Sequence, residues 1–161
     1  MAYPGRVHIA EQKDEEELMV LCRNLALENA MFPVSDDKVR AMLRRAFNRE
    51  GGVLGIIGES GKIEGMIYMM VSTFWYSDKP YLEELFLYVS PEYRKSKNAI
   101  ELMKFSKWCS DQSGFALVIG VISNEKTEGK VKLYQRQFFK PAGNFFFYKG
   151  SGKDSVIEAV A

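Results

Sequence analysis

The fold is decided by residues 82–99, which read Leu82-Glu83-Glu84-Leu85-Phe86-Leu87-Tyr88-Val89-Ser90-Pro91-Glu92-Tyr93-Arg94-Lys95-Ser96-Lys97-Asn98-Ala99. The apolar first half predicts a strand that ends before Pro91, and a polar turn then leads into a helix that begins near Ala99. The first amide groups of such a helix have no partner within it, and the helix dipole favours an anion there. Arg94, Lys95 and Lys97 add positive charge to this turn. The sequence therefore predicts a site for a phosphate-bearing ligand at the helix start.

Hydrophobic periodicity predicts the elements on either side of this stretch. Asp14, with Glu17 three residues later, has the capping pattern of a helix start, and Ser35 begins a second helix. Further helices are expected over residues 99–113 and 125–137. Strands are expected over residues 6–10, 53–58, 63–74, 81–89, 116–122 and 145–148. The resulting order, β-α-α-β-β-β-α-β-α-β, predicts an α/β (α+β) fold with a mixed sheet and helices on both faces.

Composition narrows the class of protein. The chain has 161 residues, 47% of them hydrophobic and 27% charged, which predicts a single domain over residues 1–161. The net charge of +1 disfavours a protein that coats nucleic acid, although a local basic patch stays open. Cys22 and Cys109 cannot build a disulfide framework, and His8 alone cannot supply a zinc site or a histidine-centred triad, so no metal is expected. No apolar run reaches the roughly 18 residues of a membrane span. The first ten residues lack a signal-peptide core, and we expect a soluble cytoplasmic protein.

Residues 87–99 resemble the acetyl-CoA-binding motif of the GCN5-related N-acetyltransferases. In that family a strand ending in an L-x-V-x-P-like pattern precedes R/Q-x-x-G-x-G/A. Leu87-Tyr88-Val89-Ser90-Pro91 is similar to the strand end, and Arg94 and Ala99 match the outer positions of the loop. Lys97 stands where the family has its middle glycine, a residue that permits close approach of a phosphate to the backbone. Two interpretations stay open: Lys97 supplies charge to the pyrophosphate, or the loop has lost the cofactor.

A second stretch, residues 133–143, is similar to the family pattern L-Y-x-x-x-G-F-x-x-x-G. The positions that fall in place are Tyr134, Phe139 and Gly143. Phe138 replaces a glycine, and Asn124 resembles the family's asparagine before the last helix, although its spacing to Tyr134 is longer than usual. The order of elements matches as well, so the resemblance covers nearly the whole chain. It implies a mostly antiparallel sheet of six to seven strands with four helices.

The resemblance implies transfer of acetyl from acetyl-CoA, as co-substrate, to an amine by direct attack. In the family, a gap between two parallel strands exposes a backbone amide to the thioester. Here the gap would lie between residues 81–89 and 116–122, with the amide of Val89 as donor. Tyr134 would protonate the departing thiolate, since a phenol has a reference pKa of about 10. The residues expected to bind the cofactor are Leu87, Tyr88, Val89, Arg94, Lys95, Ser96, Lys97, Asn98, Ala99 and Asn124.

Two neighbouring carboxylates, Glu83 and Glu84, are candidates for the base that takes a proton from the amine. Adjacent residues of a strand point to opposite faces, so only one of them should enter the gap. Strict alternation places Glu83 on the face of Leu87 and Glu84 on the face of Phe86. Glu84 is mildly favoured, and a solvated strand end is the alternative for both.

The resemblance implies an acceptor that is a small-molecule or peptide amine, and nothing in the sequence narrows it further. Trp75, Tyr76 and Tyr81 flank a hairpin turn, where they either line an acceptor pocket or pack on one another. The aromatic run of residues 145–148 either buries both faces or contacts another chain, which leaves a homodimer open. The competing interpretation is a non-catalytic protein of this fold that binds a protein or nucleic acid through the lysine-rich loop.

Overall fold

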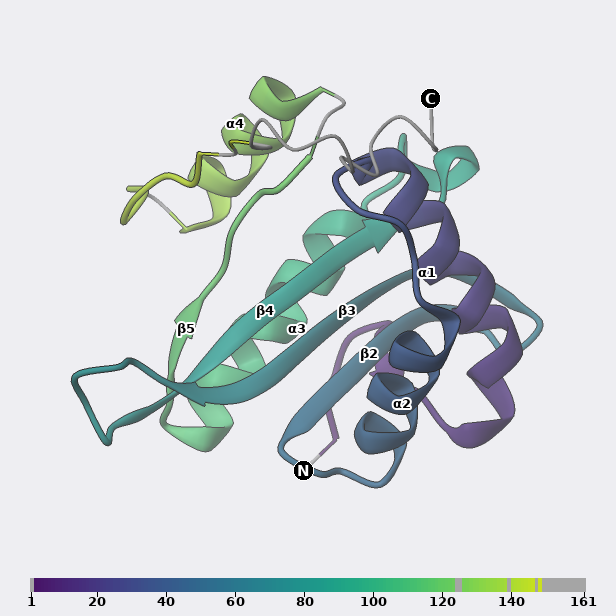
Figure 1. Ribbon diagram of the computed structural model, residues 1–161, viewed down its shortest axis with the longest axis horizontal. Helices are drawn as coiled ribbons and strands as arrows, with labels where there is room; N and C mark the ends of the chain where they lie inside the picture. The colour runs from purple at the N-terminus through teal and green to yellow at the C-terminus, as the bar shows by residue number, and fades with distance from the viewer. Residues whose placement is uncertain (1, 124–125, 139, 147, 149–161) are drawn as a thin grey trace.

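The computed structural model describes residues 2–123, 126–138, 140–146 and 148, and Figure 1 shows one sheet with helices on both sides. The sheet has the strand order β1-β2-β3-β4-β5. Its strands are β1 (His8–Ile9), β2 (Gly52–Glu59), β3 (Lys62–Thr73), β4 (Pro80–Val89) and β5 (Ala116–Val118). The helices are α1 (Glu15–Asn29), α2 (Asp36–Phe47), α3 (Asn98–Ser113) and α4 (Thr127–Phe138), with 3-10 turns at Gln12–Asp14 and Pro91–Tyr93.

The predicted mixed sheet and its four helices are confirmed. β1 to β4 pair antiparallel, and β4 pairs parallel with β5. The described part of the chain has five strands, where six to seven were expected. Phe145, Phe146 and Tyr148 lie outside any strand and are largely exposed, and β5 ends at Val118, not at residue 122. A β-forming sequence becomes a strand only where another strand offers hydrogen bonds, and these stretches have no such partner in the described residues.

The predicted cap at the start of α1 is wrong, and its two carboxylates hold a distant hairpin. Asp14 makes no side-chain cap, and it accepts hydrogen bonds from the Glu11 amide at 2.9 Å and the Ser60 hydroxyl at 2.5 Å. Glu17 accepts the amides of Gly61 at 2.7 Å and Ile63 at 2.6 Å. The Ser60 hydroxyl and the amides of Gly61 and Ile63 therefore bind the two carboxylates that a cap of α1 would use. At α2 the expected cap is present, because the Ser35 side chain accepts the Lys38 amide.

Two hydrophobic cores fix the helices to the two faces of the sheet. α1 and α2 cover one face with side chains such as Leu18 and Leu43, and α3 covers the other, where Phe105 packs near Met69. Figure 1 shows α1 and α2 in front of the sheet and α3 behind it. Gly55 allows the Phe105 ring to lie against β2, since a Cβ there would come within 2.5 Å of the ring. In the described ranges, no helix combines the length and apolar character that a membrane span requires.

Candidate active site

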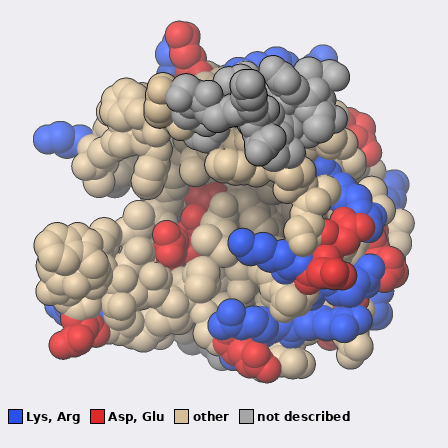
Figure 2. Space-filling view, viewed as in Figure 1, with Lys and Arg blue, Asp and Glu red and all other residues tan. Residues whose placement is uncertain are grey.

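β4 and β5 separate part of the way along the sheet. Their parallel pairing runs from Tyr81 opposite Ala116 to Glu83 opposite Val118, and β4 then continues to Val89 without β5 beside it. The space between them belongs to a pocket of about 770 Å³, which β4, the segment after β5, α3 and α4 enclose. Figure 2 shows this hollow on the face viewed in Figure 1. The expected gap between the two parallel strands is thus present as an open cleft.

A bulge in β4 decides on which face of the sheet each glutamate lies. The partners of Tyr68 and Met69 on β3 are Phe86 and Glu84, so Leu85 is an extra residue between them. Residues that pair across antiparallel strands share a face. Glu84 therefore lies on the face of Met69 and α3, whereas Glu83 lies opposite Met70 on the face of α1 and α2.

The strict alternation expected from the sequence is consequently wrong on the N-terminal side of the bulge. The extra residue puts Glu84 on the face of Leu87 and Val89, and Glu83 on the face of Phe86. Both glutamates line the pocket, so the change of face does not remove either of them from it.

The backbone of β4 directs amide groups into the cleft. The Ser90 amide donates to the carbonyl of Glu64 at 2.9 Å, and Gly65 pairs with Val89. In an antiparallel ladder, residues bonded across the pair alternate with residues whose N–H and C=O point away. The amides of Val89 and Leu87 therefore point from β3 toward the cleft. The Val89 carbonyl points the same way and accepts Nε of Arg94 at 2.8 Å.

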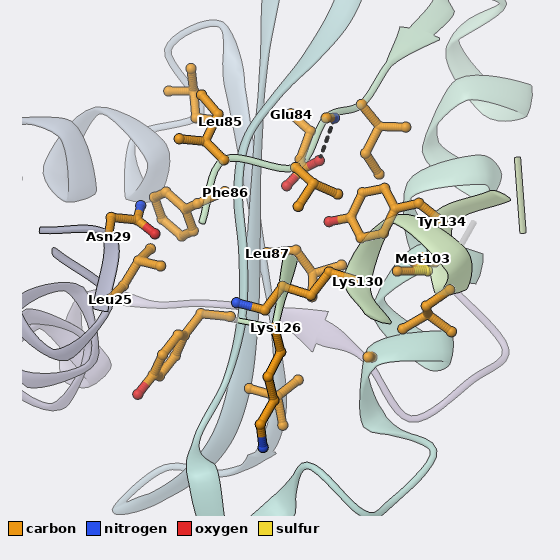
Figure 3. Close-up of a pocket in the computed structure, with 18 of the residues that line it drawn as sticks. Leu25, Asn29, Glu84, Leu85, Phe86, Leu87, Met103, Lys126, Lys130 and Tyr134 are labelled. Carbon is orange, nitrogen blue, oxygen red and sulfur yellow. Dashed lines mark hydrogen bonds between the residues drawn. The ribbon is translucent and has the colours of Figure 1, made fainter. Parts of the chain in front are cut away.

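Glu84 and Tyr134 meet where β4 and β5 separate. One Glu84 oxygen accepts the Gly120 amide at 3.2 Å, the contact drawn as a dashed line in Figure 3, and the Tyr134 hydroxyl points toward the same carboxylate. Each of the two groups shifts the pKa of the other. Gly120 follows β5 and Tyr134 belongs to α4. The pair thus joins three segments around one carboxylate.

Burial displaces the pKa values of both groups. Removal from water raises the pKa of Glu84 to about 8, with a smaller opposing effect from the Gly120 amide and the Tyr134 hydroxyl. Burial also raises the pKa of Tyr134 well above its usual value, and the neighbouring Glu84 carboxylate raises it further. At neutral pH the phenol of Tyr134 keeps its proton, while the Glu84 carboxyl group is close enough to its pKa that both its protonated and its ionised forms are present.

Arg94, the arginine of the predicted anion-binding loop, forms its interactions with other residues of the protein. Nε of Arg94 donates to the Val89 carbonyl, and the guanidinium forms an ion pair with Glu28 of α1. It also lies 5.5 Å from the centre of the Tyr88 ring. Arg94 therefore ties the loop to β4 and α1, and Glu28 offsets its charge.

Several backbone amides of the loop also donate hydrogen bonds to nearby residues of the chain. The amides of Arg94, Ser96 and Asn98 donate to the Pro91 carbonyl at 3.3 Å, the Tyr93 carbonyl at 3.1 Å and the Ser96 hydroxyl at 3.1 Å. The Asn98 side chain is completely buried and donates to Glu64 at 2.6 Å. Ser96 and Asn98 therefore shape the loop and join it to β3.

The structure brings most, but not all, of the expected site residues to the pocket. Those that line it are Glu83, Glu84, Leu87, Tyr88, Val89, Arg94, Lys95, Ala99 and Tyr134. Ser96, Lys97 and Asn98 do not line it, and Asn124 and Phe139 lie outside the described residues. The lining residues that the sequence did not single out include two with charged side chains, Lys126 and Lys130. The available signal for Lys130 was its spacing of four residues from Tyr134, which places both side chains on one face of α4.

Comparison with solved structures identifies the fold. An integron cassette protein from the mobile metagenome of Cole Harbour Salt Marsh matches with a TM-score of 0.70 at 16% identity, over 93% of each chain. AAC(6')-Iy in complex with the bisubstrate analogue CoA-S-monomethyl-acetylneamine matches with a TM-score of 0.68 at 17% identity, over 91% of this chain and 97% of that one. A predicted acetyltransferase from Clostridium acetobutylicum, solved with acetyl-CoA, matches with a TM-score of 0.67 at 14% identity, over 88% and 94%.

The chain therefore has the acetyltransferase fold, and the resemblance to the GCN5-related N-acetyltransferases is confirmed at that level. No model of a protein family matches the sequence, and no curated protein does either. At 14–17% identity the similarity establishes the fold alone. Fold does not determine chemistry, so the roles of individual residues depend on the geometry of this pocket.

Proposed function

We propose that the protein is an N-acetyltransferase that transfers acetyl from acetyl-CoA, its co-substrate, to a small-molecule or peptide amine. The observation that carries the proposal is the Glu84–Tyr134 pair at the point where β4 and β5 separate. A base and an acid with displaced pKa values, beside a directed backbone amide, are the groups that direct attack on a thioester needs. The solved structures of this fold that hold a CoA analogue or acetyl-CoA support the choice of cofactor.

Glu84 acts as the base in this proposal. A carboxyl group with a pKa of about 8 is a far stronger base than an ordinary glutamate, and a useful fraction is ionised near neutral pH. Its carboxylate takes a proton from the ammonium form of the acceptor, and the freed nitrogen attacks the carbonyl carbon of the thioester. Glu83, on the other face of β4, is the alternative base, and the contact with Tyr134 favours Glu84.

The amide of Leu87 stabilises the oxygen of the thioester in the same step. The Val89 amide, which the resemblance implied, lies five residues along β4 from Glu84, about 16 Å of extended strand, and does not reach a thioester at the Glu84–Tyr134 pair. As the C–N bond forms, negative charge develops on that oxygen, and a fixed backbone donor lowers the energy of this state more than that of the ground state. The backbone of β4 is held by its ladder with β3, so the amide is oriented before the substrate arrives.

Tyr134 protonates the sulfur when the C–S bond breaks. The thiolate leaves with the bonding electron pair and takes the phenolic proton, after which Glu84 returns a proton to Tyr134. The acceptor ammonium loses two protons in total. One ends on the thiol of CoA and the other is released to solvent, so charge and protons balance.

The cofactor would lie along β4 with its thioester near Glu84. We propose contacts from the residues that line this wall of the pocket, namely Leu87, Tyr88, Val89, Arg94, Lys95 and Ala99. Ser96, Lys97 and Asn98 would act on the cofactor only through the shape and charge of the loop. Asn124 keeps its proposed role in cofactor binding on the sequence resemblance alone.

Binding of acetyl-CoA and release of free thiol test this function together. Acetyl-CoA should raise the melting temperature, because a ligand at 100 times its Kd stabilises the folded state by about 2.7 kcal/mol. A panel of amines should then release CoA thiol from acetyl-CoA. No shift at millimolar acetyl-CoA, together with salt-dependent binding of nucleic acid, would favour the non-catalytic interpretation.

Removal of the phenol tests the proposed acid. Tyr134→Phe should lower kcat by about 100-fold or more, the usual contribution of a positioned proton donor, with little change in the Kd of acetyl-CoA. Tyr76→Phe is a matched control, because Tyr76 is 70% exposed on the β3–β4 turn. A Tyr134→Phe enzyme as fast as the wild type would show that another group protonates the sulfur.

A further inference from the structure

We infer that Lys126 and Lys130, at the start of α4, bind the diphosphate of the CoA cofactor. In this chain these two lysines would add positive charge to that of Lys95, because Glu28 offsets the charge of Arg94 in the loop before α3. The inference rests on the proposed function and assigns part of the cofactor site to residues outside the recognised motif.

The loop before α3 offers a phosphate less than its sequence suggests. Three of its amides donate within the loop or to the preceding turn, and the Arg94 guanidinium is paired with Glu28. Lys97, the residue at the glycine position of the motif, does not line the pocket. Among the loop's basic side chains, Lys95 lines the pocket and forms no ion pair with any residue that the structure describes.

α4 presents a single face to the pocket. Lys130 and Tyr134 are four residues apart on α4, Lys126 directly precedes the helix, and all three line the cavity. The Lys126 carbonyl accepts the Lys130 amide at 3.1 Å, so Lys126 lies directly before the first turn of α4, with a left-handed backbone of its own at φ 49°. In Figure 3 the two lysines extend into the pocket on the side away from Glu84. The Lys130 ammonium donates to the Ser123 hydroxyl at 2.6 Å, which directs it along the pocket wall.

The spacing on α4 suits a ligand that is reactive at one end and anionic at the other. Eight residues of helix span about 12 Å, so Lys126 lies roughly that far along the axis from Tyr134. A thioester at Tyr134 would therefore place the pantetheine arm beside Lys130 and the diphosphate within reach of the lysine side chains. The pantetheine arm carries no charge, so it offers the lysine ammonium groups no ion pair.

The pocket is also divided by charge. Glu83 and Glu84 lie where β4 and β5 separate, whereas Arg94, Lys95, Lys126 and Lys130 line the other end. Figure 2 shows acidic side chains inside the hollow and basic side chains on one side of it. An anionic group is attracted to the basic end and repelled from the acidic end, which orients the cofactor before it is fully bound.

Isothermal titration with three ligands tests the assignment in the full chain. The ligands are CoA, 3′-dephospho-CoA and S-acetylpantetheine, which differ in the phosphates they carry. The variant is Lys126→Met with Lys130→Met, because methionine keeps an unbranched apolar stem. We expect the Kd values of CoA and 3′-dephospho-CoA to rise by about 10- to 100-fold, and that of S-acetylpantetheine to stay within twofold.

Two controls separate this effect from a damaged helix. Lys132→Met removes an exposed lysine of the same helix that does not line the pocket, and it should bind all three ligands as the wild type does. Lys130→Arg keeps the charge and should retain most of the affinity for CoA. Raising the salt concentration should weaken CoA binding to the wild type more than to the double variant.

Each contrary result overturns the inference in a distinct way. Equal loss of S-acetylpantetheine would show that the lysines support the shape of the pocket. Loss of CoA alone, with 3′-dephospho-CoA unaffected, would assign them to the 3′-phosphate. A double variant with unchanged CoA binding would refute their role while leaving the proposed function intact, whereas a wild type that binds no CoA would refute both.

Discussion

At Glu84 the cost of burying a charge sets the pH range in which the site would work. The folded protein holds this proton up to a pKa of about 8, whereas the unfolded chain loses it near 4.5. Between these two values the folded state binds the extra proton, so the free energy of unfolding falls as pH rises through that window. The same carboxyl group must be ionised to accept a proton from an amine. Ionisation of Glu84 therefore lowers the free energy of unfolding and at the same time produces the base, a combination that is typical of catalytic residues.

Glu84→Gln should separate these two effects. The variant should lose the decline in unfolding free energy between about pH 4.5 and 8, which chemical denaturation at several pH values would measure. It should also lower kcat/KM by about 100-fold or more and abolish the rise of activity through pH 8. Acceptors of different amine pKa distinguish this rise from titration of the substrate. Glu83→Gln should retain the rise, and its loss in that variant would move the base to Glu83.

At the scale of elements, Glu17 is the residue of α1 whose carboxylate binds the β2–β3 hairpin. Glu17→Ala leaves the amides of Gly61 and Ile63 without their acceptor, and we expect a loss of about 1–3 kcal/mol in unfolding free energy. Glu16→Ala is the matched control on the same helix, because its ion pair with Arg40 is at the surface and contributes at most about 1 kcal/mol. Urea denaturation measures both. Equal effects would show that Glu17 contributes only as a surface charge.

The elements themselves could largely be predicted, because periodicity and turn residues act locally. The helix near Ala99 begins within a residue of its expected position, and the strand that ends before Pro91 is present. The loop, the divergence of β4 from β5 and the pocket beside Tyr134 follow the sequence resemblance. These features depend on patterns that neighbouring residues carry.

The features that could not be predicted depend on residues far apart in the chain. The bulge at Leu85 arises from the pairing of β4 with β3, and it exchanges the faces of Glu83 and Glu84. No glycine or proline at this position of the sequence indicates a bulge. Asp14 and Glu17 resemble a local cap, and the turn of a distant hairpin takes both carboxylates. The aromatic residues at 145, 146 and 148 have high β propensity, which is insufficient without a strand to pair with.

Across the whole molecule, stability is unevenly distributed around the pocket. α3 has five buried residues and packs on the sheet, whereas none of the described residues of α4 is fully buried and Tyr134 is only half-buried. α4 is held by the contact of Tyr134 with Glu84 and by Lys107, which donates to the Gln137 carbonyl and lies 4.8 Å from the centre of the Phe138 ring. The helix that carries the proposed acid is therefore the one with least apolar burial, and it should open locally more easily than the sheet and its packed helices.

Hydrogen exchange in the presence and absence of acetyl-CoA tests this asymmetry. Without ligand, the amides of α4 should exchange much faster than those of α3, because opening α4 exposes little apolar surface. A cofactor that bridges β4 and α4 binds only the closed form, so at 100 times its Kd it should slow exchange in α4 by up to about 100-fold. α2 lies on the opposite face of the sheet from α3 and should respond only to global unfolding. Equal protection of α4 and α3 without ligand would contradict the weak attachment, and ligand protection confined to the loop before α3 would mean that the cofactor does not reach α4.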